Sequence, residues 1–212
     1  MPATSEYAYH DATATCTEGY LVPRLLALLN DLHADAKIVD LGCGNGSLTV
    51  NLLRKRWTVA GVDASSSGVA RAKQAHPAIS FHVGDVTENL APLLGADAFD
   101  AVVATEVIEH LYAPRPFVRN CYALLKPGGR VVISTPYHGY LKNVSLALTG
   151  KLDRHFTALW DGGHIKFWSK HTLTALLLEA GFTDVSFHGA GRLPYLWKSM
   201  ILTATKPVQR PF

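Results

Sequence analysis

Short apolar runs rich in β-branched residues alternate along this chain with longer segments of helical periodicity. Strands are predicted at 38–41, 58–62, 79–83, 99–104 and 130–135, and helices at 18–33, 47–56, 65–76 and 116–125. Alternation of this kind predicts a parallel sheet with helices on both faces, which is an α/β, doubly wound fold. With 212 residues, the chain is long enough for one such domain.

The last third of the chain departs from this alternation and then returns to it. Residues 137–168 lose their periodicity, so we interpret them as an insertion after the fifth strand, with a short helix at 144–148. A helix at 169–180 and apolar runs at 185–188 and 196–205 would close the sheet. The predicted organisation is one domain: an N-terminal helical lid (1–35), a cofactor-binding core (36–136), a substrate-covering insertion (137–168) and the closing elements (169–212).

Composition excludes several classes of protein. Apolar residues make up 48% and charged residues 17% of the chain, which argues against disorder. No apolar run approaches the roughly 20 residues that cross a bilayer, and no secretory signal is visible. Three separated cysteines, Cys16, Cys43 and Cys121, indicate neither a disulfide framework nor a structural zinc site, so a cytoplasmic location is expected. The net charge of +3 is scattered and makes a nucleic-acid partner unexpected.

The segment after the first predicted strand carries three glycines at alternate positions, Gly42, Gly44 and Gly46. Glycine lets the backbone approach a ligand closely, and nucleotide-like ligands bind at this end of such sheets. A dinucleotide loop of the form G-x-G-x-x-G would need glycine at Ser47. Asp40, just before the loop, would repel a pyrophosphate and attract an ammonium or sulfonium group. This difference in charge favours S-adenosylmethionine over a dinucleotide.

Two further acids follow the next two predicted strands. Asp63 ends the second strand, where a carboxylate can accept hydrogen bonds from both ribose hydroxyls. Asp85 follows the third strand, within reach of an adenine amine. As an alternative, either acid alone is an ordinary turn residue after a strand. Cys43, inside the glycine loop, is interpreted as a small packing residue next to the cofactor.

Five segments, in order from Val39 to Thr135, resemble the successive motifs of class I S-adenosylmethionine-dependent methyltransferases. They are D-L-G-C-G-N-G, G-V-D-A-S, G-D-V, F-D-A-V-V-A-T-E and L-K-P-G-G-R-V-V-I-S-T. The resemblance implies a Rossmann-like, seven-stranded, mostly parallel sheet that ends in a reversed hairpin.

The same resemblance implies which positions bind the cofactor. These positions are Asp40, Gly42, Cys43, Gly44, Gly46, Asp63, Ala64, Asp85, Val86, Thr105 and Glu106. The glycine loop would hold the methionine end, Asp63 the ribose, and Asp85 with the backbone of Val86 the adenine. Thr105 and Glu106 would line the cofactor near its methyl group.

A second group of chemical side chains follows the fourth predicted strand. If this stretch turns helically, Glu106, Glu109 and His110 fall at i, i+3 and i+4 and share one face. Two carboxylates and an imidazole resemble a site for a divalent cation, Mg²⁺ or Zn²⁺, which could orient an acceptor hydroxyl pair and lower its pKa. Without metal, His110 could act as a general base. As an alternative, Glu109 accepts local backbone bonds and His110 packs.

The segment E-V-I-E-H-L is similar to two branches of the methyltransferase superfamily. One branch is the UbiG-type O-methyltransferases of ubiquinone biosynthesis, which act on catechol-like polyprenyl phenols. The other is the small-RNA 3′-terminal 2′-O-methyltransferases, which hold a magnesium ion with E-x-x-E-H and a later histidine. In this chain His164, in the segment G-G-H-I-K-F-W-S, could supply that later histidine.

The residues of the expected insertion suit a flat, apolar acceptor or form a small core of their own. They are Tyr137, His138, Tyr140, His155, Phe156 and Trp160. Near the start of the chain, Tyr7, Tyr9 and His10 are expected to belong to a lid or to a frayed terminus.

The function most favoured by the sequence is O-methylation of a small aromatic or catechol-like acceptor, with or without a divalent cation. The predicted catalytic residues are Glu106, Glu109, His110 and His164. An RNA 3′-terminal 2′-O-methyltransferase is one alternative, and it would bind RNA with steep salt dependence. An NAD-dependent oxidoreductase or an inert cofactor-binding module is another.

Overall fold

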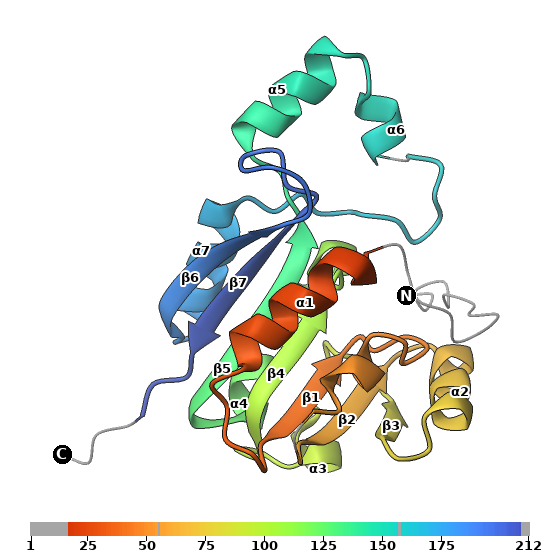
Figure 1. Cartoon of the computed structure of the whole chain (residues 1–212), viewed down its shortest axis with the longest axis vertical. Helices are drawn as coiled ribbons and strands as arrows, with labels where there is room; N and C mark the ends of the chain where they lie inside the picture. The colour runs from red at the N-terminus through yellow and green to blue at the C-terminus, as the bar shows by residue number, and fades with distance from the viewer. Residues whose placement is uncertain (1–16, 55, 157, 209–212) are drawn as a thin grey trace.

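The computed structural model describes residues 17–54, 56–156 and 158–208. These residues form one seven-stranded sheet in the order β3-β2-β1-β4-β5-β7-β6, with helices on both faces (Figure 1). The strands are β1 (Lys37–Leu41), β2 (Thr58–Asp63), β3 (Ser80–Val83), β4 (Phe99–Thr105), β5 (Leu125–Pro136), β6 (Thr183–Ala190) and β7 (Ser199–Thr205). β7 runs antiparallel to both β5 and β6, whereas the pairs among β1 to β5 are parallel. The predicted doubly wound, mostly parallel sheet with a reversed final strand is confirmed.

Helices connect the strands and cover them. They are α1 (Glu18–Leu29), α2 (Ser66–Ala75), α3 (Ala91–Leu94), α4 (Pro114–Leu124), α5 (Tyr140–Leu148), α6 (Leu152–Phe156) and α7 (Lys170–Glu179), with 3₁₀ turns η1 (Thr49–Leu52) and η2 (Ile108–His110). Within the described ranges, no helix combines the length and apolar character that a membrane span requires.

The core forms two layers, one on each side of the sheet. On one side, buried Leu25 of α1 packs in a cluster with Val103 of β4. On the other side, Phe117 of α4 and Leu173 of α7 pack in a cluster with Val102. Because successive side chains of a strand point to opposite faces, Val102 and Val103 serve different layers. Burial on both faces explains why these strands are almost continuously apolar.

The predicted helix over 47–56 is wrong, because only Thr49–Leu52 form a 3₁₀ turn. Two side chains in this region make hydrogen bonds that do not belong to a regular helix. Asn45 Oδ1 accepts a hydrogen bond from the Ser47 amide at 3.2 Å, and Thr49 Oγ1 donates to Asp40 Oδ2 at 2.7 Å. Short polar side chains that bond locally compete with helix formation, and β-branched residues lower its propensity.

Side-chain caps explain where two of the other predicted helices begin. Ser65 caps α2, because its side chain accepts a hydrogen bond from the Gly68 amide at 3.1 Å. Ser169 and Thr172 form a reciprocal capping box at the start of α7. The helix predicted over 18–33 ends earlier, at Leu29.

Residues 137–168 leave the sheet at the carboxyl end of β5 and return at α7, and Figure 1 shows α5 and α6 beyond this end of the sheet. The short helix predicted at 144–148 exists, and it begins already at Tyr140. Tyr7, Tyr9, His10 and Cys16 lie outside the described residues.

Candidate active site

The glycine loop follows β1 at the carboxyl edge of the sheet. Gly42, Gly44 and Gly46 have φ angles of +81°, +52° and +79°, a region that side chains other than glycine rarely adopt. A Cβ atom on Gly42 would lie 2.3 Å from a methyl carbon of Val107. The amide of Gly42 also donates to the Val62 carbonyl at 2.7 Å. The loop therefore needs glycine both for its conformation and for its close packing.

Asp63, at the end of β2, holds this loop in place. Its Oδ2 accepts a hydrogen bond from the Gly44 amide and its Oδ1 accepts one from the Ser65 amide, both at 2.8 Å. Burial raises the pKa of Asp63, and the two backbone hydrogen bonds oppose that rise. The neighbouring Ala64 is exposed. Asp63 therefore lies beside the loop, as the spacing predicts.

Asp40 is buried beneath the same loop, with 1% of its surface exposed. Its Oδ2 accepts the hydrogen bond from Thr49, but no described residue donates to Oδ1. Burial raises the pKa of Asp40 to about 7, and the charges of Asp63 and Glu18 add to the rise. A buried carboxylate with one unpartnered oxygen is costly, and a cation in the loop would remove that cost.

Asp85 and Val86 follow β3 at the same edge of the sheet. Asp85 is exposed, and its Oδ1 accepts hydrogen bonds from the amide and the hydroxyl of Thr87, both at 2.7 Å. Val86 is buried in the apolar layer. The interpretation of Asp85 as a turn residue therefore describes its contacts within the chain. Its neighbour Gly84 donates to the carbonyl of Asp63 at 2.9 Å, so Asp85 lies at the same edge of the sheet as Asp63.

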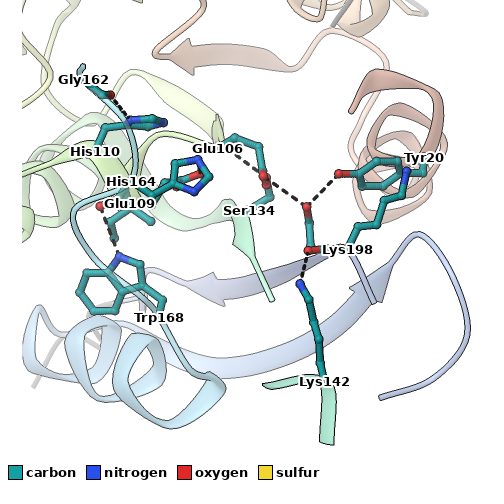
Figure 2. Close-up of polar contacts among 12 residues, drawn as sticks. Tyr20, Glu106, Glu109, His110, Ser134, Lys142, Gly162, His164, Trp168 and Lys198 are labelled. Atoms are coloured by element: carbon teal, nitrogen blue, oxygen red, sulfur yellow. Dashed lines mark hydrogen bonds and ion pairs between the residues drawn. The ribbon is translucent and has the colours of Figure 1, made fainter. Parts of the chain in front are cut away.

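Glu106 follows Thr105, the last residue of β4, and points across the sheet toward β5 and β7 (Figure 2). Its carboxylate accepts hydrogen bonds from Ser134 at 2.7 Å and from Ser199 at 3.2 Å. Burial raises the pKa of Glu106 to about 7, against the effect of these two hydroxyls and of Lys142.

The expected helical face of Glu106, Glu109 and His110 is wrong. Glu106 has a φ angle of +55°, which no helix contains, and the 3₁₀ turn begins only at Ile108. The amide of Glu106 donates to the carbonyl of Ser134, and this bond turns the chain away from a helix. Its side chain consequently points away from the other two.

Glu109, His110 and His164 do come together, from η2 and from the segment before α7. One ligand atom of each lies within 4.8 Å of the others. Two backbone bonds place His164 there, because the amides of Ile165 and Lys166 donate to the Glu109 carbonyl at 2.9 and 3.0 Å. The structure therefore brings together three of the four predicted catalytic residues, and Glu106 is the one that lies apart from them.

The carboxylate of Glu109 is fully buried, and within the described chain neither of its oxygens makes a hydrogen bond of good geometry, although the hydroxyl of Thr135 lies close enough to lower the pKa of Glu109. Nε2 of His164 lies 3.9 Å from Oε1. Burial and the charge of Glu106 raise the pKa of Glu109 well above its ordinary value. Burial and the nearby His110 lower the pKa of His164 to about 4, so its imidazole is neutral at pH 7. The cluster is arranged to receive a proton or a cation.

Residues 14–187 match a family described as a methyltransferase domain. The chain belongs to this methyltransferase domain family. A curated relative, the ubiquinone biosynthesis O-methyltransferase of Bradyrhizobium diazoefficiens, is 38% identical over 151 residues, which are 68% of this chain and 56% of the relative. The chain spans about half the length of the curated relatives that it matches.

Solved structures of methyltransferases share the fold. A methyltransferase of Methanosarcina mazei aligns with a TM-score of 0.66 at 20% identity, over 86% of this chain and 98% of its own. The phosphoethanolamine N-methyltransferase 2 of Haemonchus contortus, solved with S-adenosyl-L-methionine, aligns with a TM-score of 0.65 at 16% identity, over 88% of this chain and 52% of its own. The predicted class I methyltransferase fold is confirmed, and S-adenosylmethionine is the cofactor expected of it.

Four ring residues of segment 137–168 in this methyltransferase pack with one another, His138, His155, Phe156 and Phe167, whereas Tyr137 packs on Phe187 and Trp197 outside the segment. The ring of His138 stacks on Phe156, with 6.1 Å between centroids, and meets Phe167 edge-on at 5.1 Å. Tyr140 is 85% exposed, which separates it from this small core. Trp160 reaches the cluster of Glu109, His110 and His164, because its ring meets that of His110 edge-on with centroids 5.6 Å apart.

Sequence reasoning missed several residues that the fold adds to the site. Tyr20 of α1 bonds Ser199 through their hydroxyls at 3.1 Å, and Ser199 in turn bonds Glu106. Glu18 accepts a hydrogen bond from Ser47 at 2.6 Å beside the glycine loop. No local spacing links α1 to β7, so no pattern in the sequence indicated these contacts.

Proposed function

We propose that this protein transfers the methyl group of S-adenosylmethionine to a hydroxyl oxygen of a small aromatic or catechol-like molecule. The observation that carries the proposal is the buried carboxylate of Glu109 next to His110 and His164, as found in the described chain. Such a cluster can orient an acceptor hydroxyl and accept its proton. The curated relatives, named ubiquinone biosynthesis O-methyltransferases, support an oxygen on an aromatic ring as the acceptor atom.

The cofactor would lie along the glycine loop. Asp40 fits its positive charges, because the described residues leave Oδ1 without a donor and the site is buried. The other proposed contacts are those of the sequence prediction: Gly42, Cys43, Gly44 and Gly46 for the methionine end, Asp63 and Ala64 for the ribose, Asp85 and Val86 for the adenine, and Thr105 and Glu106 near the methyl group.

A divalent cation fits the cluster of Glu109, His110 and His164. A carbonyl oxygen only accepts hydrogen bonds, so the contact of 2.9 Å between His110 Nδ1 and the Gly162 carbonyl makes Nδ1 the donor and leaves Nε2 free. Metal-bound histidines are oriented in this way by their second nitrogen. One carboxylate and two imidazoles suit Zn²⁺ better than Mg²⁺, which prefers oxygen. When bound, such a cation lowers the pKa of a coordinated hydroxyl.

The chain's own residues would handle the proton and the alignment. His164 is neutral at pH 7, so its imidazole can accept a hydrogen bond from the acceptor hydroxyl. The raised pKa of Glu109 makes its carboxylate the stronger base of the two, and this carboxylate would take the proton. Because the sulfonium already activates the methyl group, the remaining requirement is an in-line approach of the oxygen. Glu106, held by Ser134 and Ser199, lies between the two binding regions and would keep the donor in register.

Segment 137–168 would cover the acceptor. It leaves the carboxyl end of the sheet, its carbonyl of Gly162 accepts a hydrogen bond from His110, and its His164 lies 3.9 Å from Glu109. In this proposal the organisation predicted from the sequence holds, with residues 36–136 as the cofactor-binding core and 137–168 as the substrate-covering part.

The test is a methyl-transfer assay with the purified protein. The protein is first treated with a chelator and then incubated with S-adenosylmethionine and catechol. Mass spectrometry of the reaction mixture detects a mono-methoxy product. We expect turnover that depends on added Zn²⁺ or Mg²⁺. Calorimetry should show binding of S-adenosylmethionine and none of NAD. Binding of NAD without binding of the methyl donor would overturn the proposal.

A further inference from the structure

A pocket of about 360 Å³ lies between α5, α6 and the connection from β6 to β7. It is lined by the apolar Leu146 and by Lys142, Lys151, Arg154, His155, Arg192 and Lys198. Five of these side chains are cationic at neutral pH, and within the described chain no carboxylate lines the pocket. Three separate segments therefore bring positive charge to one place.

None of the five cations takes part in an ion pair of the described residues. Other cations of the described chain do find acidic partners: Arg56, Arg115 and Arg130 each pair with an aspartate or glutamate at 2.6 to 2.8 Å. Lys142 is 6% exposed, and its Nζ donates to the carbonyls of Tyr137 and Lys198, which hold it in place without neutralising it (Figure 2). A buried, unneutralised ammonium favours an anion.

Arg192 reaches the pocket from the turn between β6 and β7. Its φ angle is +61°, next to Gly191 at +67°. This turn places the residue at the pocket.

The pocket lies beside the candidate active site. Lys198, which lines the pocket, precedes Ser199, and the hydroxyl of Ser199 donates to Glu106 at 3.2 Å. On the other side, the ring of His155 meets that of His138 with 5.3 Å between centroids, and His138 meets Phe167, three residues after His164, at 5.1 Å. These contacts place the pocket next to the region in which the acceptor would lie.

We propose that this pocket binds a carboxylate or phosphate carried by the acceptor itself, so that the substrate is an acidic aromatic molecule. The inference rests on the proposed function. The acceptor's hydroxyl lies at Glu109 and His164, and its anionic group lies among Lys142, Arg192 and Lys198. The cations then determine which acceptors are used, and the acid–histidine cluster determines where the methyl group is added.

The experiment compares acceptors that share one ring. They are 3-(3,4-dihydroxyphenyl)propanoate, its methyl ester, and 3,4-dihydroxybenzyl phosphate. The wild-type enzyme should show a KM for one or both anions that is about 10-fold below that of the neutral ester, as a charge-assisted contact provides. The carboxylate and phosphate arms identify which anion is preferred.

A double variant tests whether the pocket is responsible. Arg192→Gln with Lys198→Gln changes two exposed residues at the pocket, and Arg71→Gln with Lys73→Gln removes the same charge from exposed positions on α2. The first pair should raise KM for the anions toward that of the ester with kcat retained, whereas the second pair should leave both constants unchanged.

The outcomes separate the two proposals. Equal KM values for the acid and the ester, with methylation intact, would overturn the pocket and leave the proposed function standing. If no acceptor is methylated, the proposed function fails, and calorimetry of the propanoate on the wild type and both double variants still decides the pocket. Tighter binding of a single-stranded RNA oligonucleotide than of either acid would also overturn this inference.

Discussion

The two halves of the sheet present opposite charges at the same carboxyl edge. On the side of β1 and β2, the buried Asp40 and the half-buried Asp63 are acids around the glycine loop. On the side of β5 to β7, Lys142, Arg192 and Lys198 gather without acidic partners among the described residues. A cationic methyl donor would bind at the acidic half, and an anionic acceptor would bind at the cationic half. Glu109 lies at the junction, where the two ligands must meet.

The halves also differ in how the sequence builds them. The acidic half comes from neighbouring strands and from one short loop. The cationic half comes from two short helices and a distant turn. The first can be recognised from a local motif, whereas the second exists only once the chain has folded.

The largest effect is expected on kcat, from changing Glu109 at the junction of the two halves. Glu109→Gln keeps the shape of the side chain but removes its ability to accept a proton or to ligate a cation, so kcat should fall by roughly 10²- to 10⁴-fold. Affinity for S-adenosylmethionine should stay unchanged, because the acidic half is intact. Steady-state kinetics and calorimetry measure the two quantities. Glu88→Gln, at an exposed position, is the control. An unaltered kcat would show that the junction is only structural.

The next largest effect concerns the stability of the acidic half. Gly42→Ala combines a φ angle of +81° with a Cβ only 2.3 Å from Val107 Cγ2, so unfolding free energy should fall by about 3 kcal/mol. Gly150→Ala has a φ angle of +63° with open space around it, and about 1 kcal/mol is expected. Urea denaturation of both variants separates crowding from backbone strain. Equal losses would mean that Val107 moves aside freely.

Removing the charge of Asp40 should weaken binding of the donor and leave the acceptor half untouched. Asp40→Asn is expected to raise the Kd of S-adenosylmethionine about 30-fold, or about 2 kcal/mol, because a buried charge pair loses one partner. Asp35→Asn, which breaks an exposed ion pair with Arg56, should change the Kd little. If the variant at Asp40 binds as well as the wild type, the charge argument for this half is wrong.

The smallest effect concerns the number of protons released when S-adenosylmethionine binds. The pKa of Asp40 lies near 7 in the free protein, and a bound cation would return it toward its ordinary range, so binding at pH 7 should release roughly half a proton. Calorimetry in two buffers of different ionisation enthalpy measures this number. Asp40→Asn should release less, and an identical release would assign the proton to another group.

The same raised pKa sets the direction of the pH dependence of folding. The folded value for Asp40 lies above the unfolded value near 3.8. Its contribution to stability is therefore fully present below pH 3.8 and is lost as the pH rises through about 7. Relative to Asp40→Asn, the free wild-type protein should lose stability between these limits, as urea denaturation at several pH values would show.

The sequence predicts the sheet and the acidic half because both depend on local patterns. Ser65 caps α2 as expected, and Asp40, Gly42 and Asp63 meet at one edge because parallel strands end there. The helix predicted over 47–56 fails because Thr49 bonds Asp40 rather than supporting a helical turn.

The other half resists prediction for a different physical reason. Glu106 leaves the expected helical face because of hydrogen bonds to Ser134 and Ser199, which are far away in the sequence. Arg192 and Lys142 share a pocket only because α5 packs near the turn between β6 and β7. Contacts between distant segments leave no periodicity for sequence reasoning to find. His164 was found because a family resemblance, not a spacing, connected it to Glu109.

The position of β7 has a consequence for folding during synthesis. Although β7 comes after every other strand in the chain, it lies inside the sheet between β5 and β6. During synthesis the apolar edge of β5 waits unpaired until the residues from Ser199 onward have left the ribosome. A translation product that stops before Ser199 therefore exposes the unpaired edge of β5. Exposed strand edges bind chaperones and promote aggregation.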